Sequence, residues 1–337
     1  MRTIKTLLAT GLAGALLLGA QAARAADPVT IRIAWTVPVF NWPSILLEKQ
    51  DLARHLGKTY KLEPTRFAGT PQMITAMATG ELEIGNLAYS SFALAIQNAG
   101  MSDLRVIADE FQDGVDGYYS DEFMVRADSP IKTVEDLKGK VIVTNASGSA
   151  IDIAMRAMLR KHKIDDNKDV TFVEAPFPTM KAMLLDKKID LLPGVLPFSV
   201  DPELRKSSRD LFLQKEAVGT TQMIIWAVRG EFLQKHRAAM LDFLEDALRI
   251  VHFYVDPANQ AAVAEIAGRV AKQPAERFAG WLFTHKDYYR DHNLVPNLDA
   301  LQANMDMQRQ LGFLNDKIEV AKYADLSLVK EAAQRLK

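Results

Sequence analysis

DLKGKVIVTNASGSAID, residues 136–152, places a turn, a strand and the start of a helix in one short stretch. Residues 141–143 (VIV) are continuously apolar, as expected of a strand buried on both faces of a sheet. The loop that follows contains two serines and one glycine but no lysine, histidine or cysteine. Beyond it, apolar residues recur with helical spacing at Ile151, Ala154, Met155, Met158 and Leu159. This pattern predicts a strand, a small polar loop and a helix.

The same alternation extends in both directions from this stretch. Strands are expected at 31–35, 60–67, 82–85, 104–109, 141–143, 170–175 and 189–192. Helices are expected at 43–56, 71–79, 89–98, 151–159 and 178–186. Strands that alternate with helices predict an α/β fold with parallel sheets.

A weak internal repeat predicts two similar lobes. A shift of 107 residues superposes four pairs: Pro71 and Pro178, Met73 and Met180, Met77 and Leu184, and residues 82–84 and 189–191. From residue 231 onward the pattern is mainly helical, with helices expected at 231–254, 257–271, 274–283, 298–311 and 326–335.

Two segments are candidates for connections between the lobes, residues 118–126 and the strand-like run 220–228 (TTQMIIWAV). Two crossings make the first lobe discontinuous. We therefore expect lobe 1 at 26–119 and 226–337, and lobe 2 at 120–225. This geometry allows the lobes to close on a ligand in the cleft between them.

The first 25 residues have the pattern of a signal peptide. Arg2 and Lys5 precede an apolar run at 7–20, and Ala23-Arg24-Ala25 is a small-x-small cleavage site. The alternative, an uncleaved anchor, is disfavoured because the apolar run is too short to span a bilayer. We expect cleavage before Ala26 and a soluble periplasmic protein.

Composition excludes several classes of protein and site. The 41 basic residues nearly balance the 42 acidic residues, so no polybasic surface indicates nucleic-acid binding. The chain has no cysteine, which excludes thiolate metal sites, cysteine nucleophiles and lipid attachment at a cysteine.

A search for catalytic motifs finds none. The six histidines (His55, His162, His236, His252, His285 and His292) lack metal-binding spacing, and Gly-x-Ser-x-Gly is absent. We expect no catalytic residues, no metal and no cofactor.

The loop at Ser147, Gly148 and Ser149 is the first candidate binding site. Ser149 and Asp152 form a pair that resembles a capping box, and the glycine-containing loop can leave N–H groups uncovered at a helix N-terminus. Such an arrangement binds anions. The alternative is that the segment is only a well-capped helix.

Three further loops follow expected strands in the same way. They contain Trp35, Thr36, Asn41 and Trp42 in the first, Ala88, Tyr89 and Ser90 in the second, and Phe177 in the third. Loops at the carboxyl ends of strands form the ligand crevice of open α/β sheets. The alternative for the aromatic residues is packing, and for Ser90 a helix cap. Residues 196–198 and 220–222 are weaker candidates.

These features together resemble the periplasmic substrate-binding proteins of ABC importers, in the sulfonate, taurine and nitrate branch that includes binders similar to those of thiamine precursors. The resemblance rests on residues 69–73 (GTPQM), 79–85 (TGELEIG), 129–132 (SPIK), 136–140 (DLKGK) and 144–150 (TNASGSA), and covers about 30–255. It implies a type II binding-protein fold with two α/β lobes, and a membrane permease and ATPase as partners. It also implies that the loops at 35–36, 88–90 and 147–149 line the cleft.

The expected ligand is a small organic anion, a sulfonate or a carboxylate. No basic residue lies near Ser147 in the sequence, so backbone N–H groups would hold the head group. The aromatic residues Trp35, Trp42, Tyr89 and Phe177 favour an organic tail. Alternatives are nitrate or bicarbonate as the ligand, a pyrimidine thiamine precursor as the ligand, a ligand-loaded signalling partner, and an enzyme similar to pyrimidine-precursor synthases. We expect the protein to be a monomer.

Overall fold

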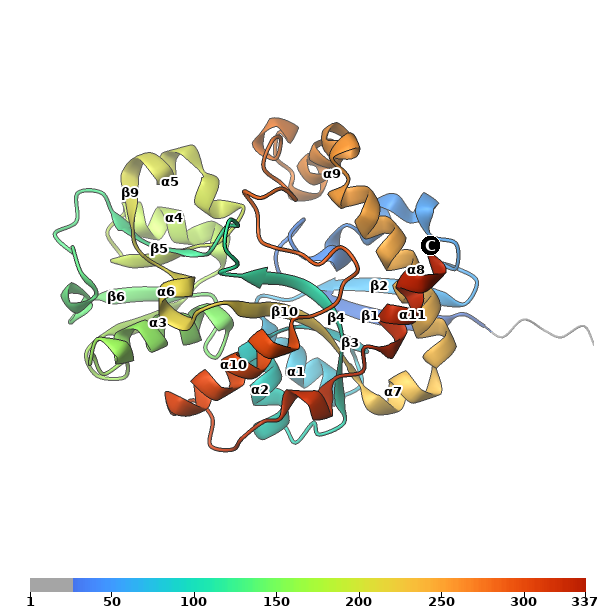
Figure 1. Cartoon of the computed structure of the whole chain (residues 1–337). Helices are drawn as coiled ribbons and strands as arrows, with labels where there is room; N and C mark the ends of the chain where they lie inside the picture. Colours follow the sequence, from blue (N-terminus) through green and yellow to red (C-terminus); the bar gives the residue numbers. More distant parts are fainter. Residues whose placement is uncertain (1–26) are drawn as a thin grey trace, which may run out of the picture.

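The computed structural model describes residues 27–337, so the expected signal peptide at 1–25 lies outside the described residues. The chain folds into two α/β lobes, each built on one five-stranded sheet (Figure 1). The first sheet has the order β2-β1-β3-β10-β4, and the second has the order β7-β6-β8-β5-β9. No helix in the described part of the chain is long and apolar enough to cross a membrane.

The strands of the first lobe are β1 (Val29–Trp35), β2 (Tyr60–Arg66), β3 (Ile84–Ala88), β4 (Leu104–Asp113) and β10 (Thr221–Arg229). Those of the second lobe are β5 (Glu122–Arg126), β6 (Val141–Thr144), β7 (Thr171–Glu174), β8 (Leu191–Gly194) and β9 (Ser208–Leu213). β10 crosses the expected lobe boundary at residue 225 and pairs along its length with β3 and β4.

The expectation of purely parallel sheets is wrong for one strand in each lobe. β10 runs antiparallel to β3 and β4, and β5 runs antiparallel to β8 and β9. Each is the first strand after the chain crosses between lobes. Neither is reached by a strand–helix–strand unit within its own sheet, so the rule that makes such connections parallel does not apply to it.

Helices of the first lobe are α1 (Thr70–Ala78), α2 (Tyr89–Gln97), α7 (Gly230–Lys235), α8 (Arg237–Val255), α9 (Gln260–Ala271), α10 (Leu298–Gln310) and α11 (Ser327–Arg335). Those of the second lobe are α3 (Ala150–Lys161), α4 (Phe177–Leu185), α5 (Pro202–Ser207) and α6 (Gln214–Val218). In Figure 1, α3 to α6 surround the second sheet, while α8 and α11 lie together beside β1 and β2.

The internal repeat corresponds to equivalent elements in the two lobes. α1 and α4 begin 107 residues apart, as do β3 and β8. Met73 and Met180 are both buried in the core, 0% and 2% exposed. The repeat therefore marks a strand and a helix that pack in the same way in each lobe.

Two expected helices are wrong. In place of a helix at 43–56 there are two short 3-10 helices, Trp42–Ser44 and Leu46–Leu52, because the backbone leaves helical geometry at Ile45 (φ −128°) and Lys49 (φ −123°). Residues 274–283 contain only the 3-10 helix Ala275–Arg277. Gly280 and Phe283 have positive φ values of 80° and 54°, which a right-handed helix cannot accommodate.

Candidate functional site

A cavity of about 60 Å³ lies between the lobes, where loops of both sheets meet. The first lobe contributes Thr36, Val37, Phe40, Asn41, Thr70, Ala88, Phe111, Met223, Ile224 and Tyr288. The second lobe contributes Asn145, Ser149, Ala150, Ile151, Phe177, Val195 and Leu196. Asp121, in the connection between the lobes, completes the lining. We call this space the cleft cavity.

Five of the expected binding residues line the cleft cavity: Thr36, Asn41, Ala88, Ser149 and Phe177. Their contact with a ligand stays a prediction. The structure places the other expected residues, Trp35, Trp42, Tyr89, Ser90, Ser147 and Gly148, outside the lining.

Three of these residues are aromatic and pack within the first lobe. Trp42 is fully buried against Phe283, with ring centroids 4.8 Å apart. Tyr89 is fully buried as well, and the guanidinium of Arg66 lies 5.5 Å from the Trp35 ring. Phe177 is the one expected aromatic residue in the lining, because Trp42 and Tyr89 fill the core and the half-buried Trp35 packs beside Arg66.

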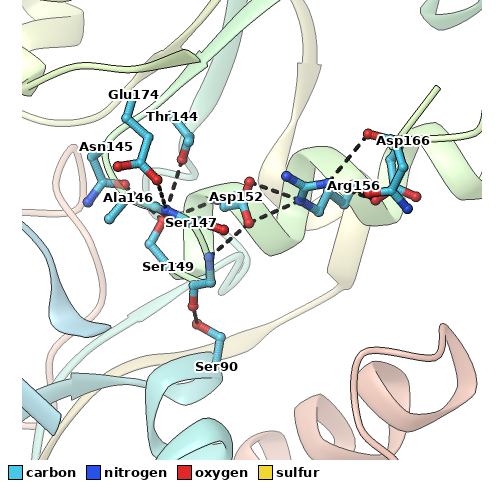
Figure 2. A network of polar contacts seen from close by, with 12 residues as sticks. Ser90, Thr144, Asn145, Ala146, Ser147, Ser149, Asp152, Arg156, Asp166 and Glu174 are labelled. Atoms are coloured by element: carbon cyan, nitrogen blue, oxygen red, sulfur yellow. Dashed lines mark hydrogen bonds and ion pairs between the residues drawn. The ribbon is translucent and has the colours of Figure 1, made fainter. Parts of the chain in front are cut away.

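The N–H groups of Ser147 and Gly148 are not uncovered, so that expectation is wrong. Ser147 N donates to Glu174 Oε1 at 2.8 Å, and Gly148 N donates to Asp152 Oδ2 at 2.9 Å (Figure 2). Carboxylates of the chain thus occupy the place that the sequence assigns to an external anion. Gly148 has a φ of +76°, a conformation that favours glycine.

Ser149 caps helix α3 by accepting a hydrogen bond of 3.2 Å from Asp152 N. Asp152 is anchored in turn by Arg156, whose Nε lies 3.0 Å from its carboxylate, and Arg156 also pairs with Asp166 (Figure 2). Burial raises the pKa of Asp152, while the Gly148 N–H and Arg156 oppose that shift. The loop is thereby held rigidly by its own charges.

The next two amides of α3, those of Ala150 and Ile151, have no acceptor within the described residues. They occupy the first two helical positions, whose N–H groups have no partner inside the helix. Both residues line the cleft cavity. The free donors at the positive end of this helix therefore lie slightly later in the sequence than expected.

Asn41 adds a donor from the opposite lobe. Its Oδ1 accepts hydrogen bonds of 2.9 Å from Thr36 N, Thr36 Oγ1 and Val37 N. Three donors on one oxygen identify the other end of the amide as Nδ2, which has no acceptor in the described part of the chain. Asn41 lines the cleft cavity. Its Nδ2 is thus an unpaired donor at the cavity.

Asn145 has the same arrangement in the second lobe. Its Oδ1 accepts a hydrogen bond of 2.9 Å from Ser149 Oγ, and its Nδ2 has no acceptor among residues 27–337. The sequence argument missed Asn145, Ala150 and Ile151, although all three belong to or adjoin the loop it singled out. Together the two asparagines and the two helix amides place N–H donors at the cavity from both lobes.

The model of the NMT1-like family matches residues 24–268, which is more than half of the chain. The chain belongs to the NMT1-like family. A search of curated proteins gives no significant match.

Solved structures share the fold of this NMT1-like protein. The alkanesulfonate-binding protein SsuA from Xanthomonas axonopodis pv. citri, bound to MOPS, is 16% identical, with a TM-score of 0.68 over 90% of this chain and 100% of that chain. The periplasmic nitrate-binding protein NrtA from Synechocystis PCC 6803 is 12% identical, with a TM-score of 0.71 over 92% and 89%. The fold is that of the type II periplasmic binding proteins, with a cleft between two α/β lobes.

The same fold also occurs in an enzyme. The desulfurization enzyme DszB is 14% identical to this NMT1-like protein, with a TM-score of 0.63 over 92% of this chain and 100% of that chain. At these identities the likeness establishes the fold alone. The lining of the cavity therefore has to carry any functional argument.

Asp121 and Tyr288 form the acidic part of the cavity of the NMT1-like protein. The Tyr288 hydroxyl donates to Asp121 Oδ1 and accepts a hydrogen bond of 3.2 Å from Leu196 N. Burial raises the pKa of Asp121 well above its usual range, and the nearby Asp113 carboxyl raises it further. The neutral acid is thus favoured. No local sequence signal pointed to either residue.

Arg290 is a buried cation behind the cavity wall. Its Nη1 pairs with Asp287 Oδ2 at 3.0 Å, and its Nη2 donates to the Phe40 carbonyl at 3.2 Å. The rings of Phe40, Trp42, Phe111, Phe283 and Tyr288 lie 5.0 to 5.9 Å from its guanidinium carbon. Arg290 thus holds three lining rings in place through cation–π contacts.

The buried Glu110 carboxyl anchors the loop that contains Asn41. It accepts hydrogen bonds from Trp42 N, Trp226 Nε1 and Asn86 Nδ2, the last at 2.9 Å. Burial raises its pKa to about 8. A carboxyl group at the centre of the first lobe thus joins β3, β4 and β10 to the loop that presents Asn41.

One group of side chains in the described residues has the composition of a metal site. His55, Asp242 and Glu245 have ligand atoms within 4.8 Å of one another. Arginines already neutralise the carboxylates: Arg249 lies 2.7 Å from Glu245, and Arg335 lies 3.5 Å from Asp242. The cluster therefore fits an ion-pair network better than a cation site.

Proposed function

We propose that this chain is the solute-binding component of an ABC uptake system in the periplasm. It captures a small organic anion, a carboxylate or a sulfonate, in the cleft cavity and delivers it as a monomer to a membrane permease and its ATPase. The observation that carries the proposal is the convergence of unpaired N–H donors from both lobes. Asn41 Nδ2 comes from the first lobe, and Asn145 Nδ2 and two amides of α3 come from the second.

Donors without a formal charge are sufficient to hold an anion. Ala150 and Ile151 present their N–H groups at the positive end of a 12-residue helix. Asp121 does not oppose this when it is neutral, which its raised pKa favours. A ligand that accepts from both lobes at once favours the closed arrangement over the open one. The permease then recognises the closed arrangement of the lobes.

We propose binding without chemistry because of the groups that line the cavity. Neither histidine nor lysine is among the described lining residues, and the chain has no cysteine. The hydroxyl groups of the lining already have partners. Tyr288 donates to Asp121, and Thr70 bonds Ser91. The hydroxyls of Thr36 and Ser149 donate to side-chain amide oxygens. A nucleophile beside a matching base, which covalent catalysis requires, is not formed there.

Asp121 supports a second candidate ligand, an aminopyrimidine such as a thiamine precursor. A buried carboxyl at the cavity pairs with an amino group and a ring nitrogen, and Phe111 and Phe177 offer faces for stacking. Nitrate and bicarbonate are disfavoured as ligands, because these ions have no apolar surface that the two rings could contact.

A ligand screen separates these classes. Alkyl and aryl sulfonates, aromatic carboxylates, nitrate and an aminopyrimidine are tested by thermal shift and calorimetry. A ligand present at 100 times its Kd adds about 2.7 kcal/mol to the free energy of unfolding. Stabilisation by carboxylates or sulfonates supports the anion, and stabilisation by the aminopyrimidine alone supports the second candidate. If no compound stabilises the protein, the proposed function is wrong.

A further inference from the structure

A second, larger pocket adjoins the cleft cavity. Its volume is about 240 Å³, and it lies between the second lobe around α4 and α5 and the first-lobe segment after α9. We call it the tail pocket. Its walls include Pro38 and Ala271 from the first lobe and Phe198 and Val200 from the second. Nothing in the proposed function so far uses this space.

The two spaces share a wall. Phe177 lines both, and it stacks on Phe198 with ring centroids 6.0 Å apart. Two pairs of consecutive residues also connect the spaces. Leu196 lines the cleft cavity and Pro197 lines the tail pocket. In the same way, Val37 lines the cleft cavity and Pro38 lines the tail pocket. Phe177 is half-buried and is the one residue that lines both spaces among the described residues.

The tail pocket offers apolar surface without an unpaired charge. Its charged residues neutralise one another, since Asp201 lies 3.1 Å from Lys181 and 3.2 Å from Arg277. Lys181 also lies 2.9 Å from Glu203. The remaining walls are formed mainly by proline, phenylalanine and aliphatic side chains. Such a surface binds hydrocarbon rather than a second polar group.

We propose that the ligand is amphipathic, with its polar head in the cleft cavity and an apolar tail of several carbons that passes Phe177 into the tail pocket. This rests on the proposed function for the head group. The sizes of the two spaces support it: about 60 Å³ admits only a head, whereas about 240 Å³ admits a chain or ring. The solute is then a medium-chain or aryl-substituted acid rather than a very short one.

The test measures how affinity depends on chain length. Straight-chain alkanesulfonates and alkanecarboxylates of increasing length are titrated by calorimetry, and 1-octanol serves as a probe that has the tail without an acidic head. We expect affinity to rise about threefold to fourfold per added methylene and then to level off when the pocket is full. We also expect 1-octanol to stabilise the protein weakly.

Two variants fill the tail pocket from opposite lobes, Ala271→Phe and Val200→Phe. Both sites are half-buried, and neither residue lines the cleft cavity. We expect them to lower the affinity for long acids at least tenfold and to leave short acids unchanged. Ala182→Phe is the matched control, because Ala182 is exposed on α4 and lines neither space.

The outcomes are distinguishable. Binding of short acids without any gain from chain length overturns the tail proposal and leaves the proposed function standing. A length dependence that survives in both filling variants also overturns it, because the tail then lies elsewhere. If acids of every length and 1-octanol all fail to bind, both proposals fall together.

Discussion

The Ser90 hydroxyl of the first lobe donates a hydrogen bond of 2.9 Å to the Gly148 carbonyl oxygen of the second lobe. Ser90 lies in the first turn of α2, and Gly148 lies in the loop before α3. This contact joins the start of α2 in the first lobe to the loop before α3 in the second lobe (Figure 2). It connects the two lobes, and neither residue lines the cleft cavity.

Removing this hydroxyl is expected to weaken ligand binding. Ser90→Ala loses one net hydrogen bond of about 0.5–1.5 kcal/mol in the closed state only, so affinity falls about 2- to 10-fold. Calorimetry measures the change, and small-angle scattering measures the shift toward open lobes. Ser102→Ala is the control, because Ser102 is exposed and lies outside the cleft. Equal affinities in both variants would contradict a role for this contact in closure.

A side chain at Gly148 is expected to oppose closure. An added Cβ would lie 2.8 Å from Leu94 Cδ1 of the first lobe, and the φ of +76° costs about 1–2 kcal/mol for any other residue. Gly80→Ala is a matched control with a φ of +73° and open space around its Cβ. Both variants lower the melting temperature, but only Gly148→Ala lowers affinity. A loss of affinity in Gly80→Ala as well would show that backbone strain alone explains the effect.

Asn41→Asp tests the donor from the first lobe. The substitution keeps the oxygen that accepts from Thr36 and Val37 and replaces Nδ2 with a second oxygen. A carboxylate close to the bound head group repels it, so affinity for sulfonates and carboxylates falls at least about tenfold. Asn293→Asp carries the same charge change at an exposed site. An unchanged affinity in Asn41→Asp would place the head group away from Asn41.

Asp121 is expected to make anion binding depend on pH. Its pKa is raised by burial, so the neutral acid at lower pH accepts an anion beside it, and ionisation as the pH rises repels that anion. Affinity therefore falls with rising pH. Asp121→Asn abolishes the fall and keeps the acceptor for Tyr288, because no donor approaches Oδ2 within the described residues.

Calorimetric titrations across the pH range measure this dependence in both proteins. For the aminopyrimidine we expect Asp121→Asn to lower the affinity, because the substitution removes the carboxyl group that pairs with this ligand. A pH dependence that is identical in the two proteins would assign the effect to another group.

The buried carboxyls are expected to make the protein less stable as the pH rises. The pKa of Glu110 is raised to about 8 and that of Asp109 to about 7, in both cases mainly by burial. Between the unfolded and the folded pKa, the folded state binds protons that the unfolded state has lost. This contribution is thus complete below the unfolded pKa and disappears as the pH rises through the folded value.

Calorimetric unfolding from about pH 5 to pH 8 measures the resulting decline in melting temperature. Glu110→Gln should flatten the decline, whereas Glu81→Gln, at an exposed glutamate, should not. A melting temperature that rises across this range would show that Glu110 and Asp109 are ionised in the folded protein without cost.

Most elements of the fold were predictable because their signals are local. The apolar run at 141–143 and the helical spacing from Ile151 correspond to β6 and α3. The strands β5 and β9 were not predicted as strands, since each carries charged residues among its apolar ones. The order and direction of strands depend on two crossings between lobes, which no local pattern encodes.

The candidate site was likewise predictable only where its features depend on local sequence. The residue spacing of TNASGSAID was sufficient to predict a capped helix start, because a cap and a helix dipole depend on neighbours within one turn. Which N–H groups remain free depended on the tertiary structure. Glu174, 27 residues beyond Ser147, occupies one amide, and Asp152 is turned toward another. Hydrogen-bond donors are taken by whatever acceptor the folded chain brings close, and that proximity is a property of packing.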